Sequence, residues 1–143
     1  MVFEISVFLE NKIEHFEKIT RLLRETEINI RSLLLNNIHH GWGVLHLLVD
    51  DPQKAYNVLS EAGNSVSMRE MIALGMKDES GGLDELLIHI SKAGIHIESA
   101  YSRVIEADKK AILLLEVPDV RDANQRLNAI GVNPLNDSVV YGK

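Results

Sequence analysis

Cysteine is absent from this chain of 143 residues. Its absence excludes disulfide scaffolds, Cys-ligated zinc sites, iron–sulfur clusters and thiol catalysis, and it is consistent with a cytoplasmic protein. The sequence also lacks an apolar run of about 18 residues, so we expect no membrane-spanning helix and no membrane partner. The first residues, MVFEISVFLENK, lack the basic segment and the apolar run of a signal peptide, and we expect none.

Positive charge is scarce as well. Fifteen basic residues stand against 21 acidic ones, which gives a net charge of −6. The two halves are alike, because residues 1–67 carry six basic and nine acidic residues, and residues 68–143 carry nine and twelve. Binding of nucleic acid through its phosphates requires clustered Lys and Arg. The sequence contains no such cluster, so we expect no nucleic-acid partner.

Signatures of catalysis and of metal binding are also missing. The sequence has no Gly-x-Ser-x-Gly motif, no phosphate-binding loop and no dinucleotide-binding fingerprint. The six histidines do not have the spacing of metal ligands, and the adjacent His39 and His40 would point to opposite faces of a strand. Paired carboxylates such as Glu14 and Glu17 lie on polar helix faces, where hydration is their ordinary role. We therefore expect a protein that is not an enzyme and uses no metal or cofactor.

The apolar pattern of the first half predicts the order β-α-β-β-α-β. Alternation over Phe3–Leu9 indicates a strand, and apolar residues at helical spacing after it indicate an amphipathic helix. Asp51 followed by Pro52 is typical of a helix start, and Gly63 is typical of a helix end. The remaining expected elements are a strand from residue 28, a turn at 36–41, a strand at 44–49 and a strand near 66–68.

The second half repeats this order. At an offset of 67, Ile28–Ser32 falls on Ile95–Ser99, and Asn11 falls on Asp78. After the hairpin the offset becomes 68, and Asp51 then falls on Asp119. These matches indicate an internal duplication. The expected elements are strands at 71–76, from 95, at 111–117 and at 139–141, with helices from 83 to 94 and from 119 to 130.

Each half therefore follows the ferredoxin-like plan. We expect an α+β fold with two βαββαβ units side by side, at residues 1–69 and 70–143, each an antiparallel sheet with helices on one face. Units of about 70 residues are marginal alone, so contact between them or a homodimer would cover the open faces and edges. The runs Leu33–Leu35 and Ile112–Leu115 indicate strands buried on both faces. Trp42 is expected to cover the core or an interface, with stacking on a ligand as the alternative.

Two segments of the first half, Phe8–Lys12 and Glu27–Ile30, resemble the ACT domain. That family has the pattern N/D-x-P-G-x-L, then a helix, then G-I-N-I. The corresponding segments of the second half are Asp78–Leu83 and Gly94–Ile97. The resemblance spans nearly the whole chain as a tandem pair. It implies regulation by a small ligand, usually a free amino acid.

Both loops depart from the family pattern. The proline is absent from both copies, where Ile13 and Ser80 stand. The glycine is kept as Gly81 but is replaced by Glu14 in the first copy. In the family this glycine lets the loop backbone approach the ligand, and a negative charge at Glu14 would repel a carboxylate. The resemblance therefore favours the second loop as the binding site.

Each loop leads into the start of a helix, where free N–H groups favour a carboxylate. Asn11 and Asp78 can bind an ammonium group there, although such residues also commonly cap helices without contacting a ligand. In proteins similar to this family the ligand lies between this loop and the start of the second strand of an adjacent unit. The resemblance thus implies the candidate ligand-binding residues Asn11, Lys12, Ile13, Glu14, Asn29, Ile30, Asp78, Glu79, Ser80, Gly81, Gly82, Leu83, His96 and Ile97.

These observations lead to the hypothesis of a dimeric tandem ACT protein that binds a free amino acid or a similar small metabolite. The ligand would act by linkage, since it favours the arrangement of units that binds it more tightly. The alternative is a ligand-free interaction module, or a regulatory subunit that docks on a metabolic enzyme. In that case the lost prolines and glycine would mark a pocket that no longer binds. A small enzyme is the alternative with least support in the sequence.

Overall fold

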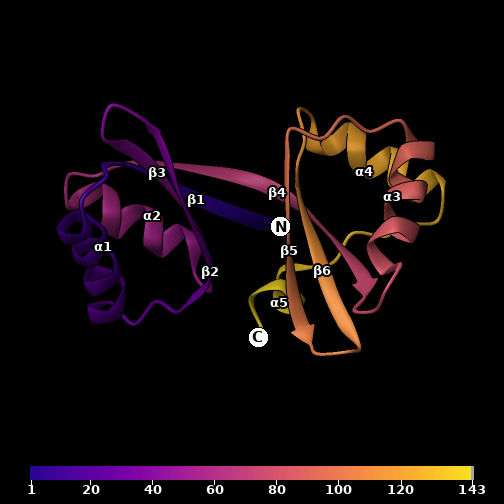
Figure 1. Ribbon diagram of the computed structural model, residues 1–143, viewed down its shortest axis with the longest axis horizontal. Coiled ribbons are helices and arrows are strands. Elements are labelled where there is room, and N and C mark those ends of the chain that lie inside the picture. The colour runs from indigo at the N-terminus through magenta and orange to yellow at the C-terminus, as the bar shows by residue number, and fades with distance from the viewer. Residues whose placement is uncertain (143) are drawn as a thin grey trace. The chain divides into compact units, whose positions relative to one another are not determined.

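The computed structural model describes residues 1–142 and shows an α+β fold of two compact units. The N-terminal unit comprises Phe3–Arg69 with residues 141–142, and the C-terminal unit comprises Met1–Val2 with Glu70–Val140. No helix within residues 1–142 has the length and hydrophobicity needed to span a membrane. The elements in chain order are β1 (Val2–Glu10), α1 (Ile13–Glu25), β2 (Ile30–His39), β3 (Trp42–Val49), α2 (Pro52–Glu61), β4 (Ser65–Lys77), α3 (Gly82–Ala93), β5 (Ser99–Glu106), β6 (Lys110–Glu116), α4 (Val120–Ala129) and α5 (Asp137–Tyr141) (Figure 1).

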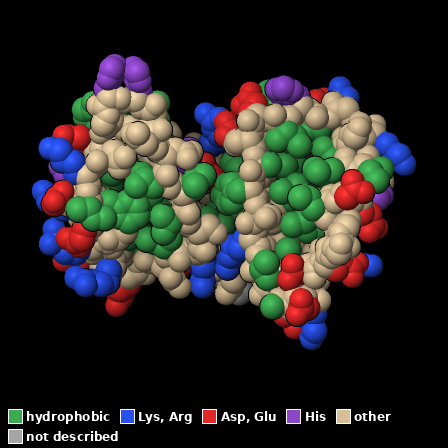
Figure 2. Space-filling model, viewed as in Figure 1, with side chains coloured by type: hydrophobic (Ala, Val, Ile, Leu, Met, Phe, Trp, Pro, Cys, Tyr) green, Lys and Arg blue, Asp and Glu red, His purple; other side chains and the backbone are tan. Residues whose placement is uncertain are grey.

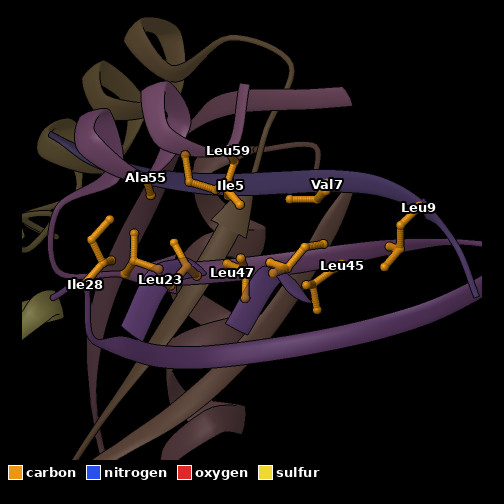
Figure 3. Close-up of a cluster of buried hydrophobic side chains, with 11 residues drawn as sticks. Ile5, Val7, Leu9, Leu23, Ile28, Leu45, Leu47, Ala55 and Leu59 are labelled. Atoms are coloured by element: carbon orange, nitrogen blue, oxygen red, sulfur yellow. The ribbon is translucent and has the colours of Figure 1, made fainter. Parts of the chain in front are cut away.

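In the N-terminal unit, β3 pairs antiparallel with both β1 and β2. The register places Leu47 opposite Ile5 and Leu45 opposite Leu35. Alternate residues of β1 and β3 therefore point to one face, where α1 and α2 pack with their apolar stripes. Figure 3 shows this core, which consists of Ile5, Val7, Leu9, Ile19, Leu23, Ile28, Leu45, Leu47, Val49, Ala55 and Leu59.

The C-terminal unit has the same plan. β6 pairs antiparallel with both β4 and β5, with Leu113 opposite Leu74 and Leu114 opposite Tyr101. The helices α3 and α4 supply the other half of its core. That core consists of Ile72, Leu74, Leu86, Ile90, Leu113, Leu115, Val117, Ala123 and Leu127.

Several expected boundaries are wrong in detail. The turn expected at 36–41 is strand up to His39, because a two-residue turn at His40 and Gly41, both with positive φ, closes the hairpin. The strands expected near 66–68 and at 71–76 form one strand, β4, of 13 residues. The strand expected from Ile95 begins only at Ser99.

The strand expected at Val139–Tyr141 is wrong, because α5 covers these residues. Its start has a side-chain cap, since the side-chain oxygen Oδ1 of Asn136 accepts hydrogen bonds from the Val139 N–H at 3.2 Å and the Ser138 hydroxyl at 2.6 Å. Just before it, Leu135 donates its N–H to the Ala73 carbonyl of β4 at 2.8 Å. This single bond stands where a full fourth strand was expected.

The expectation of strands buried on both faces is half right. Ile112, Leu113, Leu114 and Leu115 are all buried within the C-terminal unit. In the N-terminal unit, Leu33 and Leu34 are each 49% exposed. Their strand, β2, pairs only with β3 in this unit, so an edge strand accounts for the difference. Figure 2 shows hydrophobic side chains gathered on a face of each unit.

Candidate functional site

The two candidate loops occupy equivalent positions, between β1 and α1 and between β4 and α3. Asn11 donates its backbone N–H to the Gly41 carbonyl at 2.6 Å, and Asp78 donates its N–H to the Lys109 carbonyl at 3.3 Å. In both repeats the loop is thus joined to the turn of the neighbouring hairpin. The second loop has an additional bond, because Asp78 Oδ2 accepts the N–H of Asp108 at 2.7 Å.

The capping interpretation of Asn11 and Asp78 is wrong. The residue that precedes α1 is Lys12, the residue that precedes α3 is Gly81, and neither donates or accepts a side-chain capping bond. The N–H groups of Leu83 and Asp84 in the first turn of α3 have no acceptor within residues 1–142. The start of α3 therefore presents free N–H donors to solvent, together with the positive end of the helix dipole.

The adjacent glycines of the second loop have different roles. Gly81 has φ +86°, in the left-handed region, and no atom lies within 4 Å of the position a Cβ would take. Gly82 is buried, and the Lys77 carbonyl oxygen fills the space of its missing Cβ. The first glycine turns the chain and the second lets the helix approach β4 closely.

Each unit has a pocket beside its loop. The N-terminal pocket has a volume of about 460 Å³, and the C-terminal pocket has a volume of about 270 Å³. Each is formed where the end of a strand, the next helix and the segment after the unit's second helix meet, and Trp42 at the start of β3 also lines the N-terminal pocket. The N-terminal pocket is lined by Phe8, Leu9, Glu10, His15, Lys18, Ile19, Trp42, Gly63, Asn64 and Ser65. The C-terminal pocket is lined by Gly75, Met76, Lys77, Gly82, Glu85, Leu86, His89 and Val132.

The acidic and basic residues occupy opposite positions in the two pockets. At the offset of 67, Glu10 corresponds to Lys77, and Lys18 corresponds to Glu85. The strand therefore contributes the acid and the helix the base in the N-terminal pocket, whereas the strand contributes the base and the helix the acid in the C-terminal pocket. Duplication has kept the position of the pocket but not its chemistry.

The other candidate residues lie at the opposite end of each unit. Asn29 and Asp50 bond reciprocally, with the Asn29 N–H donating to Asp50 Oδ1 at 3.0 Å and the Asp50 N–H donating to the Asn29 carbonyl at 3.1 Å. Ile30 packs against the N-terminal core. His96 lines a small pocket of about 140 Å³ beside the start of α4, and Ile97 packs on the C-terminal core.

Within one unit, then, the structure does not bring the two predicted halves of the site together. Gly82 and His96 are separated by the twelve residues of α3, a distance of about 18 Å along the helix axis. Asn11 and Asn29 are likewise separated by α1. Neither unit by itself therefore contains the complete predicted site.

A side-chain cluster on β1 and β3 invites a catalytic interpretation. The carboxylate of Glu4, which is 5% exposed, lies 3.0 Å from Nδ1 of His46, and the hydroxyl of Ser6 lies 3.1 Å from the same nitrogen. In a catalytic triad the acid and the nucleophile contact different ring nitrogens. This cluster is therefore not arranged for proton relay. No group of three or more His, Asp or Glu side chains within residues 1–142 could hold a metal ion.

One ion pair shapes the electrostatics of the N-terminal pocket. Lys12 Nζ lies 2.8 Å from Glu10 Oε1. The hydrogen bond from Lys12, and secondarily its positive charge, hold the pKa of the Glu10 carboxyl below its ordinary value. The same contact raises the pKa of Lys12. The acid of this pocket is thus already engaged by a residue of the chain itself.

Residues 1–133 match the family described as an ACT domain pair. The chain belongs to this family. A solved structure of protein BT0572 from Bacteroides thetaiotaomicron is similar to the ACT pair, with 25% identity, a TM-score of 0.87 and coverage of 99% of this chain and 96% of that one.

Two other solved structures share the fold at lower identity. The ligand-free regulatory subunit of aspartate kinase from Thermus thermophilus has 13% identity and a TM-score of 0.65, and covers 90% of this chain and 89% of that one. The regulatory subunit of aspartate kinase from Thermus flavus has 12% identity and a TM-score of 0.54, with 90% and 92% coverage. No curated protein matches the chain.

Eight charged or polar residues of the two loop pockets of the ACT pair were not among the candidates, namely Glu10, His15, Lys18, Asn64, Ser65, Lys77, Glu85 and His89. They belong neither to the short loop motif nor to the start of the second strand, which were the two parts of each site that the resemblance marked. The sequence did contain a signal for four of them, Glu10, Lys18, Lys77 and Glu85. Aligning the two halves at the offset of 67 shows opposite charges at two equivalent positions, one at a strand end and one on the following helix.

Proposed function

We propose that this ACT domain pair is a non-catalytic regulatory protein that binds a free amino acid at the Asp78–Leu83 loop. The observation that supports this most is the combination of charges around the C-terminal pocket. The N–H groups of Leu83 and Asp84 and the ammonium of Lys77 would bind the carboxylate. The carboxylate of Glu85 would bind the α-ammonium group. A zwitterion satisfies both charges at once.

The size and conformation of this site support a small ligand. Its volume of about 270 Å³ lies just below the usual range of ligand pockets, roughly 300 to 1,000 Å³. Gly81 leaves open space at the mouth of the loop, which would let the ligand's carboxylate reach the helix start. The first loop has Glu14 in place of Gly81, and we propose that it does not bind an amino acid in this way.

The regulatory part of the proposal is supported by the fold it shares with two regulatory subunits of aspartate kinase. We assign the functional repeats to residues 1–69 and 70–143, acting as a homodimer in the cytoplasm. Asn29, Ile30, His96 and Ile97 would complete the site from an adjacent unit. The ligand would then shift the arrangement of the units by its difference in affinity for each arrangement.

The test is a thermal-shift screen of the purified chain against the twenty amino acids, with hits measured by calorimetry. A ligand at 100 times its Kd stabilises by about 2.7 kcal/mol, which gives a shift of several degrees. We expect one hit, and we expect Lys77→Glu and Glu85→Lys each to weaken it at least about tenfold.

The matched controls are Lys92→Glu and Glu61→Lys, which make the same charge changes on exposed helix positions that line neither pocket. Both should bind like the unaltered chain. If no amino acid shifts or binds the folded protein, the amino-acid proposal is wrong. If a hit is insensitive to both pocket variants, the proposed site is wrong.

A second candidate function is docking on a metabolic enzyme. Its support is the number of large hydrophobic side chains that the N-terminal unit exposes, among them Phe8, Leu34, Ile38 and Trp42. The structure of aspartokinase alpha and beta subunits, at 17% identity and a TM-score of 0.57, shows the fold in an enzyme assembly. This candidate predicts that the purified chain changes the kcat/KM of an enzyme that co-purifies with it, without any added amino acid.

A further inference from the structure

The N-terminal pocket has a chemistry that the amino-acid proposal does not use. Its volume of about 460 Å³ is within the range of small-molecule sites. It lies wholly within one unit and is distinct from the pocket beside Asp78–Leu83. Its lining combines an aromatic pair with two nitrogen-bearing side chains from α1.

The aromatic pair is unusual because it is exposed. The rings of Phe8 and Trp42 stack with centroids 5.0 Å apart and planes only 2° from parallel. Phe8 is nevertheless 46% exposed and Trp42 is 43% exposed. Rings that are packed only as core would be covered, whereas this pair leaves aromatic surface beside a pocket. A third ring placed against it would gain burial and stacking.

The two nitrogen-bearing groups make no direct polar contact within the described residues, although the charge of His15 acts on Glu10. Neither the ammonium of Lys18 nor the imidazole of His15 has an ion-pair or hydrogen-bond partner within residues 1–142. Both project from the first half of α1, one turn apart, and both line the pocket. They can therefore donate hydrogen bonds to an anionic group of a bound molecule.

The one acid that lines the pocket already has a cationic partner from the chain. Glu10 is held by Lys12 at 2.8 Å, and its pKa is lowered accordingly. A ligand ammonium would have to compete with Lys12 for this carboxylate. With Glu10 offset by Lys12, the uncompensated charge of the lining is positive, unlike the mixed charge at the C-terminal pocket.

We propose that the N-terminal pocket binds an aromatic carboxylate without an α-ammonium group, that is, an arylacetate or an aryl 2-oxo acid. The aromatic ring lies against Phe8 and Trp42, and the carboxylate accepts hydrogen bonds from Lys18 and His15. The two halves of the duplicated chain therefore bind ligands of different charge type at equivalent positions.

Trp42 makes the test direct, because it is the single tryptophan of the chain. Phenylacetate is titrated against the full-length protein, with tryptophan fluorescence and calorimetry as parallel readouts. The matched probes are cyclohexylacetate, which has the anion without the aromatic ring, phenethylamine, which has the ring with the opposite charge, and phenylalanine, which has both charges. We expect a change of Trp42 emission with phenylacetate, and, by the same emission, binding at least about tenfold weaker for the other three.

The variant series assigns the site. Lys18→Glu should weaken phenylacetate binding at least about tenfold, and Lys18→Arg should retain it, because the positive charge is kept. Trp42→Leu should lose binding by calorimetry while circular dichroism shows a folded protein. Lys77→Glu, at the other pocket, and Lys92→Glu, on an exposed helix, should bind like the unaltered chain.

Three outcomes would overturn the proposal. One is the absence of both a fluorescence change and heat of binding with phenylacetate. Another is an equal change of Trp42 emission with phenethylamine or phenylalanine. The third is equal sensitivity to Lys77→Glu and Lys18→Glu, which would place the molecule in the C-terminal pocket or in none. Because Trp42 lines only the N-terminal pocket, its emission separates this result from amino-acid binding beside Asp78–Leu83.

Discussion

The carbonyl oxygen of Lys77 lies against the Cα of Gly82, in the space that a Cβ would occupy. This contact brings the start of α3 against the last residue of β4 and so forms one wall of the C-terminal pocket. The glycine that the family motif marks as the ligand's access point is the preceding one, Gly81. The second glycine, Gly82, is needed for a different reason, which is steric: a side chain there would collide with the Lys77 carbonyl oxygen.

Gly82→Ala should therefore destabilise the protein. The methyl group would meet a backbone oxygen rather than a flexible side chain, so the chain must shift at a cost of about 1–3 kcal/mol. The measurement is the free energy of unfolding in urea. The control is Leu83→Ala at the next, exposed position, with an expected change within about 0.5 kcal/mol. If Gly82→Ala is as stable as the control, the close approach of α3 to Lys77 is wrong.

Asp78→Ala and Asn11→Ala should differ, although the two positions are equivalent in the repeats. Asp78 accepts the N–H of Asp108, whereas the side chain of Asn11 has no hydrogen-bond partner within residues 1–142. Loss of a hydrogen bond to a charged acceptor should cost about 1.5–3 kcal/mol in Asp78→Ala. Asn11→Ala should stay within about 0.5 kcal/mol. Equal losses in urea unfolding would contradict the assigned role of Asp78.

Local patterns in the sequence were sufficient for the fold. Asp51 and Asp119 do begin their helices, each accepting the backbone N–H of the residue three positions later, at 3.2 and 3.1 Å. Gly94 does end α3 in a left-handed conformation. These signals depend on neighbours within one turn, so a single sequence contains them.

Features that depend on distant partners could not be predicted in the same way. The segment at 139–141 has the β-branched composition of a strand, yet it is helical, and its Tyr141 hydroxyl contacts the backbone of Phe3, 138 residues away in the sequence. Leu33 and Leu34 have the composition of a buried strand, but their strand lies at the edge of its unit. Each pocket also needs the segment after the unit's second helix, Gly63–Ser65 in one unit and Val132 in the other, which is far in sequence from the loop motif.

Tyr141→Phe tests how the end of the chain is held in the N-terminal unit. The Tyr141 hydroxyl accepts the N–H of Phe3 at 2.8 Å and donates to the Phe3 carbonyl at 3.4 Å, and the side chain is 2% exposed. Removing the oxygen leaves the N–H without this acceptor, which should cost about 1–3 kcal/mol in urea unfolding. Tyr56→Phe is the control, because Tyr56 is half-buried and its hydroxyl has no partner within residues 1–142. A loss no larger than that of the control would show that the Tyr141 hydroxyl contributes nothing.

The ion pair of Glu10 and Lys12 gives a prediction for pH. Because Lys12 lowers the pKa of Glu10, the pair favours the folded state above the ordinary pKa of the carboxyl, and this contribution is lost as the pH falls through the lowered pKa. Both side chains are exposed, so the effect on stability is small, and the pKa itself is the better observable. Lys12→Met should raise the pKa of Glu10 toward its ordinary value.

The pKa can be followed by the chemical shift of the Glu10 carboxyl carbon in an NMR titration. Lys18→Met is the matched control. It removes a lysine that lines the same pocket but does not contact Glu10. An equal rise in both variants would mean that Glu10 senses the general charge of the pocket rather than Lys12.

A free Glu10 in Lys12→Met should also admit an ammonium group. The same variant should therefore bind phenylalanine more tightly than the unaltered chain, with phenylacetate binding weakened, because Lys12 no longer neutralises the Glu10 carboxylate in the pocket.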